Sequence, residues 1–491
     1  MTTSTAPVPS SVPSPVSPAQ QQPPTAPRGL LPVVLTATFM TALDFFIVNV
    51  AIPSMQLKLG ASASAIQWIV AGFSLALAAG LITAGRLGDI AGRRRVFSLG
   101  LALFTLSSAA CGLAPTAGVL IAARAVQGLS AALMGPQVLV LLRTSYQGAA
   151  QAKAFAMYGL TMGIGAVFGQ LIGGLLIRAD LFGLDWRACF LINLPVGLAT
   201  LALVPRTVPE SRAPQRPRLD NTGVALVTTA LVTLVLPLIQ GRSQGWPLWT
   251  WLCLAGSAAL FTGFGLHQHR LSGRDGSPLV HTGLFRERAF SAGMAAQLAF
   301  WLGQGSFFLI LALYLQQGRG LDALASGLVF TAIGGGYLAT SMTAHLLAAR
   351  MGRQVPAVGA LLMALGLGLL WLAVGSLGSG GGTGGVLRLV PGLVVDGLGM
   401  GMVIAPLTGA VLTRVSPQLV GSASGVLATV QQVAGALGIA LIGIVFYGAV
   451  GDGAASGYPH AFQLGLAALV ALELVLAGLV QLLPRRAGAA A

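Results

Sequence analysis

One acidic residue, Asp44, lies inside the first long apolar stretch of the chain, in the string MTALDFFIVNVAIP at residues 40–53. A charged side chain at the centre of a bilayer costs roughly 2.5–3.5 kcal/mol on insertion scales, so a charge retained there indicates a use. Burial favours the neutral form of a carboxyl group, whereas a nearby cation favours the ionised form. A carboxyl group that is exposed in turn to the two sides of the membrane can bind a proton on one side and release it on the other. We therefore predict proton binding at Asp44; the alternative is a structural polar network with Asn49.

Three more charged residues lie within apolar stretches. An arginine at such a depth usually faces a pathway or a partner, so Arg124 is a functional candidate. Its alternative is a structural role in which carbonyls or Gln127 satisfy the guanidinium. Asp396 precedes closely spaced glycines in the string GLVVDGLGMGMV and is a second candidate for cation or proton binding. Glu473, in the last apolar stretch, is predicted to be structural, either paired with a polar neighbour or protonated.

The composition decides what kind of element positions these residues. Of the 491 residues, 8% are charged and 55% are hydrophobic, and the mean hydropathy is +0.83, whereas a soluble domain has roughly 25% charged residues. Apolar stretches of about 20 residues, long enough to span hydrocarbon, recur along the chain. The sequence therefore predicts an all-α polytopic membrane protein. The three cysteines lie in separate apolar stretches, which argues against a disulfide framework or a metal site.

Gly, Pro and charged residues divide the chain into fourteen predicted spanning helices. The Pro-rich segment 1–28 and the segment 484–491 are expected to be tails, the first of them disordered. The predicted spans are 31–55, 63–87, 95–114, 117–142, 150–178, 187–205, 221–240, 248–268, 289–317, 323–348, 355–375, 387–414, 420–449 and 459–483.

The distribution of basic residues predicts the orientation. The net charge is +15, but lysines and arginines recur in short loops and form no single patch, so a nucleic-acid partner is not expected. With an even number of spans, most of these residues fall on the side of both termini. By the positive-inside rule both termini are then cytoplasmic. The bacterial cytoplasmic membrane is the expected location, since the Ala/Gly/Leu/Arg-rich composition suggests a GC-rich bacterial genome.

A weak internal repeat divides the spans into halves. A shift of 260 residues places Asp44 over Gln304 and Gly92-Arg93 over Gly352-Arg353. We predict two six-helix bundles, at 29–205 and 289–483, separated by linkers and an inserted helix pair at 206–288. Repeated halves are typical of secondary transporters, whose substrate site lies near the midplane between them. Candidates for lining such a cavity, each with ordinary packing as its alternative, are Phe46, Trp68, Phe300, Trp301 and Gln304.

The loop after the second span reads GRLGDIAGRRRVF, residues 85–97. Its glycines allow close approach of helices, and Asp89 is expected to face a cluster of three arginines. A basic loop that only sets topology is the alternative. The whole string resembles the loop motif of the major facilitator superfamily. The resemblance implies a conformational role for Gly85, Asp89, Gly92, Arg93 and Arg94.

Other strings resemble the fourteen-span drug:proton antiporter branch of that superfamily: LDFFIVNVAIP at 43–53, LIAARAVQGLSAA at 120–132 and GLTMGIGAVFGQLIGG at 159–174. The resemblance implies the major facilitator fold and a role for Arg124 in proton coupling or substrate contact. Gln170 replaces the proline usual in the third motif, which leaves a small-residue face without the proline kink. Packing at a helix seam is implied for Gly165, Gly169, Gly173 and Gly174.

Together these features predict an exporter of amphipathic small molecules, such as drugs or antibiotics, that exchanges them for protons by alternating access. The proton gradient is the expected energy source and no cofactor is expected, since the sequence has no nucleotide-binding P-loop. No catalytic constellation indicates an enzyme. The alternative within transporters is a dedicated exporter of one endogenous metabolite or self-made antibiotic. The expected partners are substrate, protons and lipid, and the expected state is a monomer.

Overall fold

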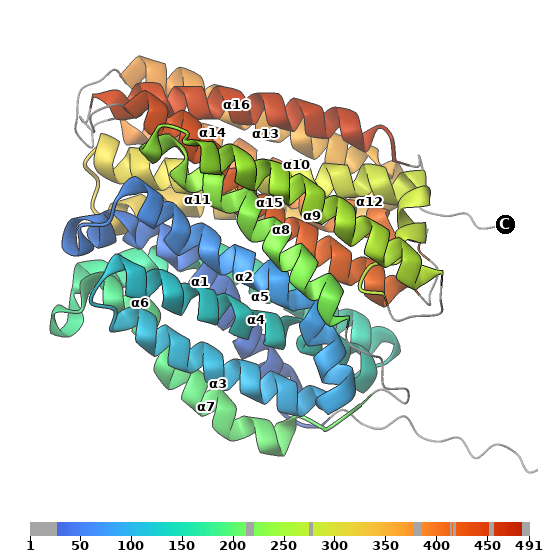
Figure 1. Cartoon of the computed structure of the whole chain (residues 1–491). Helices are drawn as coiled ribbons and strands as arrows, with labels where there is room; N and C mark the ends of the chain where they lie inside the picture. The colour runs from blue at the N-terminus through green and yellow to red at the C-terminus, as the bar shows by residue number, and fades with distance from the viewer. Residues whose placement is uncertain are drawn as a thin grey trace, which may run out of the picture.

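A computed structural model of the whole chain describes residues 27–212, 220–273, 278–377, 385–412, 415, 419–450 and 456–483. The predicted tail 484–491 and nearly all of the predicted tail 1–28 lie outside these described residues. Within them, every regular element is a helix, as predicted (Figure 1).

Fourteen helices are long and apolar enough to cross a membrane, which confirms the predicted number. Their bounds agree with the predicted spans to within a few residues at most ends. The helices are α1 (Leu30–Leu59), α2 (Ala63–Ala91), α3 (Arg93–Gly112), α4 (Ala117–Ser145), α5 (Gly148–Ala179), the continuous pair α6 (Ala188–Leu191) and α7 (Asn193–Thr207), α8 (Asn221–Gln240), α9 (Leu248–Ser272), α10 (Arg288–Leu313), α11 (Ala323–Ser341), α13 (Gln354–Leu377), α14 (Val390–Leu412), α15 (Val420–Val450) and α16 (Gly457–Val480).

The tenth span differs from its prediction. A single helix was expected over 323–348, but α11 ends at Ser341 and a short helix, α12 (Ala344–Met351), follows. The backbone N–H of Thr343 donates to the carbonyl oxygen of Thr340 at 3.1 Å. This bond reaches three residues back, as in a turn, and not four as in an α-helix. The side chain of Thr340 also donates to the carbonyl oxygen of Leu398 at 2.8 Å, which fixes the end of α11 on α14.

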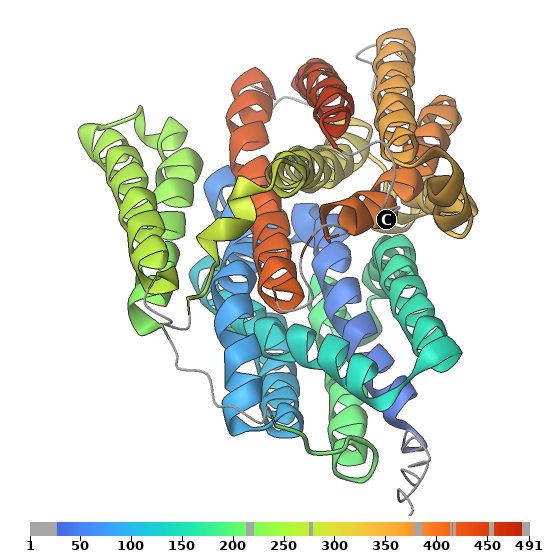
Figure 2. The same ribbon diagram turned by 90° about the vertical axis from the view of Figure 1, so that its right-hand side faces the viewer.

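The helices pack into two groups that meet along two seams. The first group contains α1 to α5 with α6 and α7, and the second contains α10, α11 and α13 to α16. The seams are the contacts of α5 with α11 and of α2 with α15. Figure 2 shows α8 and α9 set to one side, and α8 contacts both α2 and α15. The inserted pair therefore touches both groups through one helix.

The two groups use the same close helix contacts. In the first group, a Cβ placed on Gly128 of α4 would lie 2.3 Å from the carbonyl oxygen of Phe73 of α2. In the second, a Cβ on Gly397 of α14 would lie 2.1 Å from the carbonyl oxygen of Ile333 of α11. Phe73 and Ile333 are related by the 260-residue shift of the sequence repeat. Only glycine allows backbones to approach this closely, so both contacts depend on its missing side chain.

The two groups are joined at the end of the molecule that lies opposite the Arg93–Arg95 loop. We call these two ends the opposite end and the arginine end. At the opposite end, the side chain of Gln316 donates to the carbonyl oxygen of Val50 at 3.1 Å, and Gln317 donates to Gln56. Here α5 also meets α11 most closely, since a Cβ on Gly174 would lie 2.4 Å from the carbonyl oxygen of Ala323.

We predict that the substitution Gly174→Ala separates the two groups at the opposite end. The new methyl group meets the backbone of α11, which must retreat by about 1 Å to restore ordinary contact distances. Spin labels on Leu181→Cys and Gly320→Cys, introduced in a Cys253→Ser background, should report a longer distance. Gly159→Ala is the matched control in the same helix, because no atom lies within 4 Å of the added methyl group. An equal distance in both variants would contradict the prediction.

Candidate functional site

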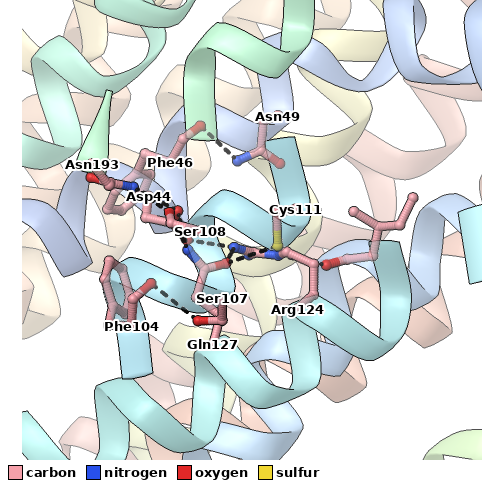
Figure 3. Close-up of polar contacts among 11 residues, drawn as sticks. Asp44, Phe46, Asn49, Phe104, Ser107, Ser108, Cys111, Arg124, Gln127 and Asn193 are labelled. Atoms are coloured by element: carbon pink, nitrogen blue, oxygen red, sulfur yellow. Dashed lines mark hydrogen bonds and ion pairs between the residues drawn. The ribbon is translucent and has the colours of Figure 1, made fainter. Parts of the chain in front are cut away.

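Asp44 and Arg124 form a buried ion pair inside the first helix group. The side chain of Asp44 is 0% exposed and that of Arg124 is 1% exposed, and Nη1 of the guanidinium donates to Oδ2 of the carboxylate (Figure 3). The pair joins the middle of α1 to α4. Burial of either charge alone would cost several kcal/mol, so each residue requires the other.

Amides and a hydroxyl complete the coordination of the pair. The side-chain nitrogen of Gln127 donates to Asp44 Oδ1 at 2.8 Å and to Ser108 at 2.9 Å, while its oxygen accepts from Arg124 at 2.8 Å. Asn193, the first residue of α7, donates to the same Asp44 oxygen at 3.2 Å and to Ser108 at 2.9 Å. These side chains come from α1, α3, α4 and α7, and Figure 3 shows them pointing toward one another.

The remaining surface of the guanidinium is also occupied. Its Nε donates to the carbonyl oxygen of Ile69 at 3.1 Å, and its carbon lies 4.3 Å from the ring centre of Phe73 and 5.7 Å from that of Phe190. Aromatic faces attract cations, most strongly where water is excluded. Arg124 is therefore held by an acid, an amide, a carbonyl and two rings.

This coordination suits the ionised, acceptor-only form of Asp44. Its Oδ1 accepts from Gln127 and Asn193, whereas its Oδ2 accepts from Arg124. A proton on Oδ1 would displace one of its two donors, and a proton on either oxygen would remove the negative charge that attracts Arg124. The predicted alternative network with Asn49 is wrong in its partner, because the amide of Asn49 donates to the carbonyl oxygen of Phe46 at 3.2 Å.

Two members of the network were not predicted as site residues. Asn193 and Ser108 are ordinary polar residues within apolar stretches, and neither carries a charge that would single it out. The signal available in the sequence was that Asn193 is a polar residue in an otherwise apolar run, CFLINLPVG. Its partner could not be read there, since it lies 149 positions away in the chain.

The loop motif has a different ion pairing from the one predicted. Asp89 was expected to face three arginines, but it pairs with Arg93 alone, at 3.0 Å. Glu210, in the segment after α7, lies 3.8 Å from both Arg94 and Arg95 and accepts from the backbone N–H of Arg94 at 3.2 Å. The acid that pairs with Arg94 and Arg95 is therefore Glu210, which lies 116 positions from Arg94 in the sequence. A local motif cannot reveal such a partner.

Glycines of this motif fit tight places. Gly92 begins α3 with φ of 108°, and a Cβ there would lie 2.6 Å from Oε1 of Glu210. Gly88 packs against Gln137 of α4, while Gly85 has only ordinary contact with Pro136. The close-packing role predicted for the motif is thus strongest at its central and last glycines.

The glycine-rich motif of α5 packs against two different helices, α1 and α11. Gly165, Gly169 and Gly173 pack against α1, where each missing side chain leaves room for the backbone or side chains of residues 42–50. Gly174 instead packs against α11 of the second group. One motif therefore contributes both to packing within the first group and to the seam between the groups.

The four aromatic cavity candidates belong to one hydrophobic cluster: Phe300 is buried in it, and Phe46, Trp68 and Trp301 pack against it. Phe46 of α1 packs edge-on against Phe308 of α10, between the two helix groups. Trp301 donates to Gln297 at 3.0 Å. The indole nitrogen of Trp68 and the side-chain oxygen of Gln304 have no hydrogen-bond partner among the described residues.

The inserted pair is tied to the chain that enters the second group. Burial raises the pKa of Asp220, but hydrogen bonds from His267, the Gly223 backbone and Gln268 outweigh it and hold that pKa below its usual value. The oxygen of Gln268 accepts from the backbone of Val280 at 3.1 Å. These contacts hold both helix ends of the inserted pair at the arginine end.

The next link reaches the first group. Nη2 of Arg86, in α2, donates to the carbonyl oxygen of Pro278 at 3.1 Å. Burial, with a smaller effect of Arg86, lowers the pKa of His281. Acidification below pH ~6.5, the usual pKa of histidine, therefore works against the folded state at this junction.

Fourteen spans, two repeated helix groups and a buried ion pair define a polytopic membrane transport protein. The family model for the Major Facilitator Superfamily matches residues 34–439. The chain belongs to this superfamily, as the sequence resemblance implied.

Several curated relatives are named for antibiotic or drug export. The "Probable actinorhodin transporter" of Streptomyces coelicolor is 40% identical over 91% of this chain and 77% of that protein. The "Tetracenomycin C resistance and export protein" of Streptomyces glaucescens is 34% identical over 85% and 76%. The "Multidrug resistance protein Stp" of Mycobacterium tuberculosis is 33% identical over 83% and 73%.

Solved structures agree in fold. A POT family transporter crystallised in complex with 5-aminolevulinic acid superposes with a TM-score of 0.68, covering 92% of this chain and 97% of that one. The sequence identity is 15%, so the likeness concerns the fold alone.

We predict that Arg124→Met destabilises the protein by about 3–5 kcal/mol, because the carboxylate of Asp44 loses the one cationic partner that it has among the described residues. The double variant Asp44→Asn/Arg124→Met should recover most of this loss, since it removes both charges. Thermal unfolding in detergent at neutral pH measures both effects. A double variant as unstable as Arg124→Met would show that the charge pairing is not what the site requires.

We also predict that Gly92→Ala destabilises the loop motif by about 1–3 kcal/mol, since alanine is strained at this φ and displaces Glu210. Gly60→Ala is the matched control, because Gly60 also has positive φ, 61°, but no neighbour within 4 Å of an added methyl group. Unfolding of the two variants should therefore differ by the loss of the Glu210 contacts and by the greater backbone strain at Gly92, whose φ 108° and ψ 134° suit alanine less than the φ 61° and ψ 31° of Gly60. Equal destabilisation would contradict that role of Glu210.

Proposed function

We propose that the protein is a proton-coupled antiporter that exports amphipathic small molecules across the bacterial cytoplasmic membrane. The observation that carries this proposal is the buried Asp44–Arg124 pair, because a proton on the acid removes the charge that holds the guanidinium. Such a pair converts proton binding into a change of contacts between α1, α4 and α7. Relatives named for export support the direction of transport.

The transport cycle is alternating access between two arrangements of the helix groups. The arrangement described above is joined at the opposite end by Gln316, Gln317 and the contact of Gly174 with α11. With the termini in the cytoplasm, as the basic loops favour, that end faces outward. The arrangement is then closed to the outside, ready to take substrate from the cytoplasm.

Proton and substrate are coupled through the state of Asp44. A proton that arrives from outside neutralises the carboxylate and frees Arg124 from its strongest partner. Arg124 then holds to Gln127, the Ile69 carbonyl and the rings, and the balance between the two arrangements changes. Loss of the proton to the cytoplasm restores the pair. Asp396 is the further candidate for coupling, and the loop residues Asp89, Arg93 and Arg94 act on the arrangement at the arginine end.

The substrate class follows from the aromatic side chains that lie between the two helix groups. Phe46 of α1 and Phe308 of α10 contact each other there, and aromatic walls suit amphipathic molecules with flat apolar parts. Trp68, Phe300, Trp301 and Gln304 remain the other candidates for contact. The protein acts as a monomer, with protons and lipid as its other partners; the proton gradient supplies the energy.

A second candidate function is the dedicated export of one endogenous metabolite or self-made antibiotic. It is favoured by the names of two relatives, which refer to the transport of actinorhodin and the export of tetracenomycin C. The two candidates differ in breadth of substrate alone. Export that is restricted to one compound class in a panel of unrelated drugs would favour the second.

We predict that Asp44→Asn abolishes export driven by the proton gradient. Cells loaded with a fluorescent amphipathic drug report the export rate, and an uncoupler that collapses the gradient should reduce the rate of the intact protein to that of the variant. Asp44→Glu should recover part of the rate, because a carboxyl group is retained.

The matched control is Glu287→Gln, which neutralises an exposed acid at the start of α10 and should export at the intact rate. Export by Asp44→Asn at the intact rate, unaffected by the uncoupler, would refute the assignment of Asp44.

A further inference from the structure

Two acids lie inside the second helix group without partners. Asp396 of α14 is 1% exposed and Glu473 of α16 is 2% exposed. Neither oxygen of Asp396, nor Oε2 of Glu473, has a hydrogen-bond partner among the described residues. No ion pair of the described residues includes either acid. Buried polar groups are rarely left in this condition, and each such case requires an explanation.

Both acids lie where helices of the second group pack closely. A Cβ placed on Gly366 of α13 would lie 2.5 Å from the backbone nitrogen of Asp396, and one on Gly303 of α10 would lie 3.1 Å from Oε1 of Glu473. Figure 1 shows α13, α14 and α16 side by side, and α13 contacts both of the others. Both α14 and α16 also contact α10. The two acids therefore lie on helices that pack against the same two neighbours, α10 and α13.

The internal repeat identifies this site as a counterpart of the Asp44 network. Gly128 and Gly397 make equivalent contacts in the two groups, which relates α4 to α14 by 269 residues. A second contact gives the same shift: Gly100 packs on Ser130, Leu133 and Met134, whereas Gly359 packs on Gly399, Met402 and Val403. By this shift Asp396 stands in the place of Gln127.

The same shift places Leu393, which is fully buried, where Arg124 stands. The relation of α1 to α10 is also fixed by contacts. Gly169 of α5 packs on Phe46, and Gly438 of α15 packs on Ser306, which is related to Phe46 by 260 residues.

By that relation Gln304 takes the place of Asp44, and its side-chain oxygen, in a residue only 5% exposed, also lacks a partner. The second group thus has a polar layer at the equivalent place. In it, Gln304 replaces Asp44 and Asp396 replaces Gln127, while Leu393 replaces Arg124.

Without the arginine, the layer has no cation to balance its carboxyl groups. Two buried carboxylates near each other cannot both be ionised at acceptable cost. Helix α13 carries no titratable residue. The other titratable or charged residues on the helices packed against α14 and α16 are Arg288, Tyr314, Tyr337, His345, Arg350, Arg388, Tyr447, Tyr458 and His460.

We propose that Asp396 and Glu473 form a proton-binding site in the second helix group, in which the two carboxyl groups share protons where the first group has an acid–arginine pair. Each binding event adds one proton to a carboxylate oxygen and removes one negative charge, and no other bond changes. The chain then holds two proton sites of opposite design, one built around a cation and one without it.

Infrared difference spectroscopy of the purified full chain in lipid vesicles tests the binding site. A step from high to low pH should produce the carbonyl band of a protonated carboxylic acid. The band should be smaller in Asp396→Asn and in Glu473→Gln and smallest in the double variant, which retains only the contribution of other acids such as Asp44. Asp44→Asn should leave the contribution of Asp396 and Glu473 unchanged. A band that is unaltered in the folded double variant overturns the proposal, as does loss of the band on adding sodium at constant pH.

A charge placed at the missing position is a sharper test of the counterpart relation. Leu393→Arg should pair with the two acids and reduce the band to its size in the double amide variant, whereas Leu393→Met, of similar volume, should leave it unchanged. A band of unreduced size in folded Leu393→Arg overturns the relation. If that variant does not fold, the amide variants decide the question, because they change neither size nor shape appreciably.

A role of this site in transport rests on the proposed function. In that case Glu473→Gln should lower the number of protons exchanged per exported substrate, measured in vesicles from the gradient that just stops export. If the number of protons per substrate is unchanged in Glu473→Gln while its infrared band is reduced, the coupling role is overturned and the proton-binding proposal still holds. Failure of the proposed function itself would appear separately, as full export by Asp44→Asn.

Discussion

The buried pair of Asp44 and Arg124 is the interaction on which the rest of the first helix group depends. A charge at this depth is tolerated only when another charge and a full set of hydrogen bonds accompany it. Helices α1, α3, α4 and α7 each supply one part of that set. The positions of these helices therefore depend on one buried carboxyl group, and the proposed proton coupling is based on this dependence.

Glycine provides the second constraint, because the polar side chains can meet only if the backbones lie close. The contacts of Gly128 with Phe73 and of Gly397 with Ile333 show the same solution in both groups. At the seam, Gly174 brings α5 onto α11 in the same way. Contacts of this kind are shape-dependent and contain few specific bonds, so two such arrangements can be close in free energy.

The two helix groups share a packing plan but differ in electrostatics. Gln127 accepts and donates beside an ion pair, while its counterpart Asp396 is an acid that forms no ion pair or side-chain hydrogen bond with any described residue. The two helix groups thus share close glycine contacts and a polar layer, but they differ in the charges of that layer. A transporter built from two similar halves can in this way place two different proton affinities at equivalent depths.

Sequence reasoning reached the class and the number of spans, and it singled out Asp44 and Arg124, which the structure brings together as an ion pair. It could do so because hydropathy, length and the cost of a buried charge are local properties. It also found the 260-residue repeat. It missed Asn193, Ser108 and Glu210, whose roles depend on partners in distant segments. It placed Asp89 among three arginines, since neighbours in sequence say little about which side chains meet. Only the tertiary structure decided these partners, because hydrogen bonds and ion pairs are set by helix packing, and packing joins residues that the chain keeps far apart.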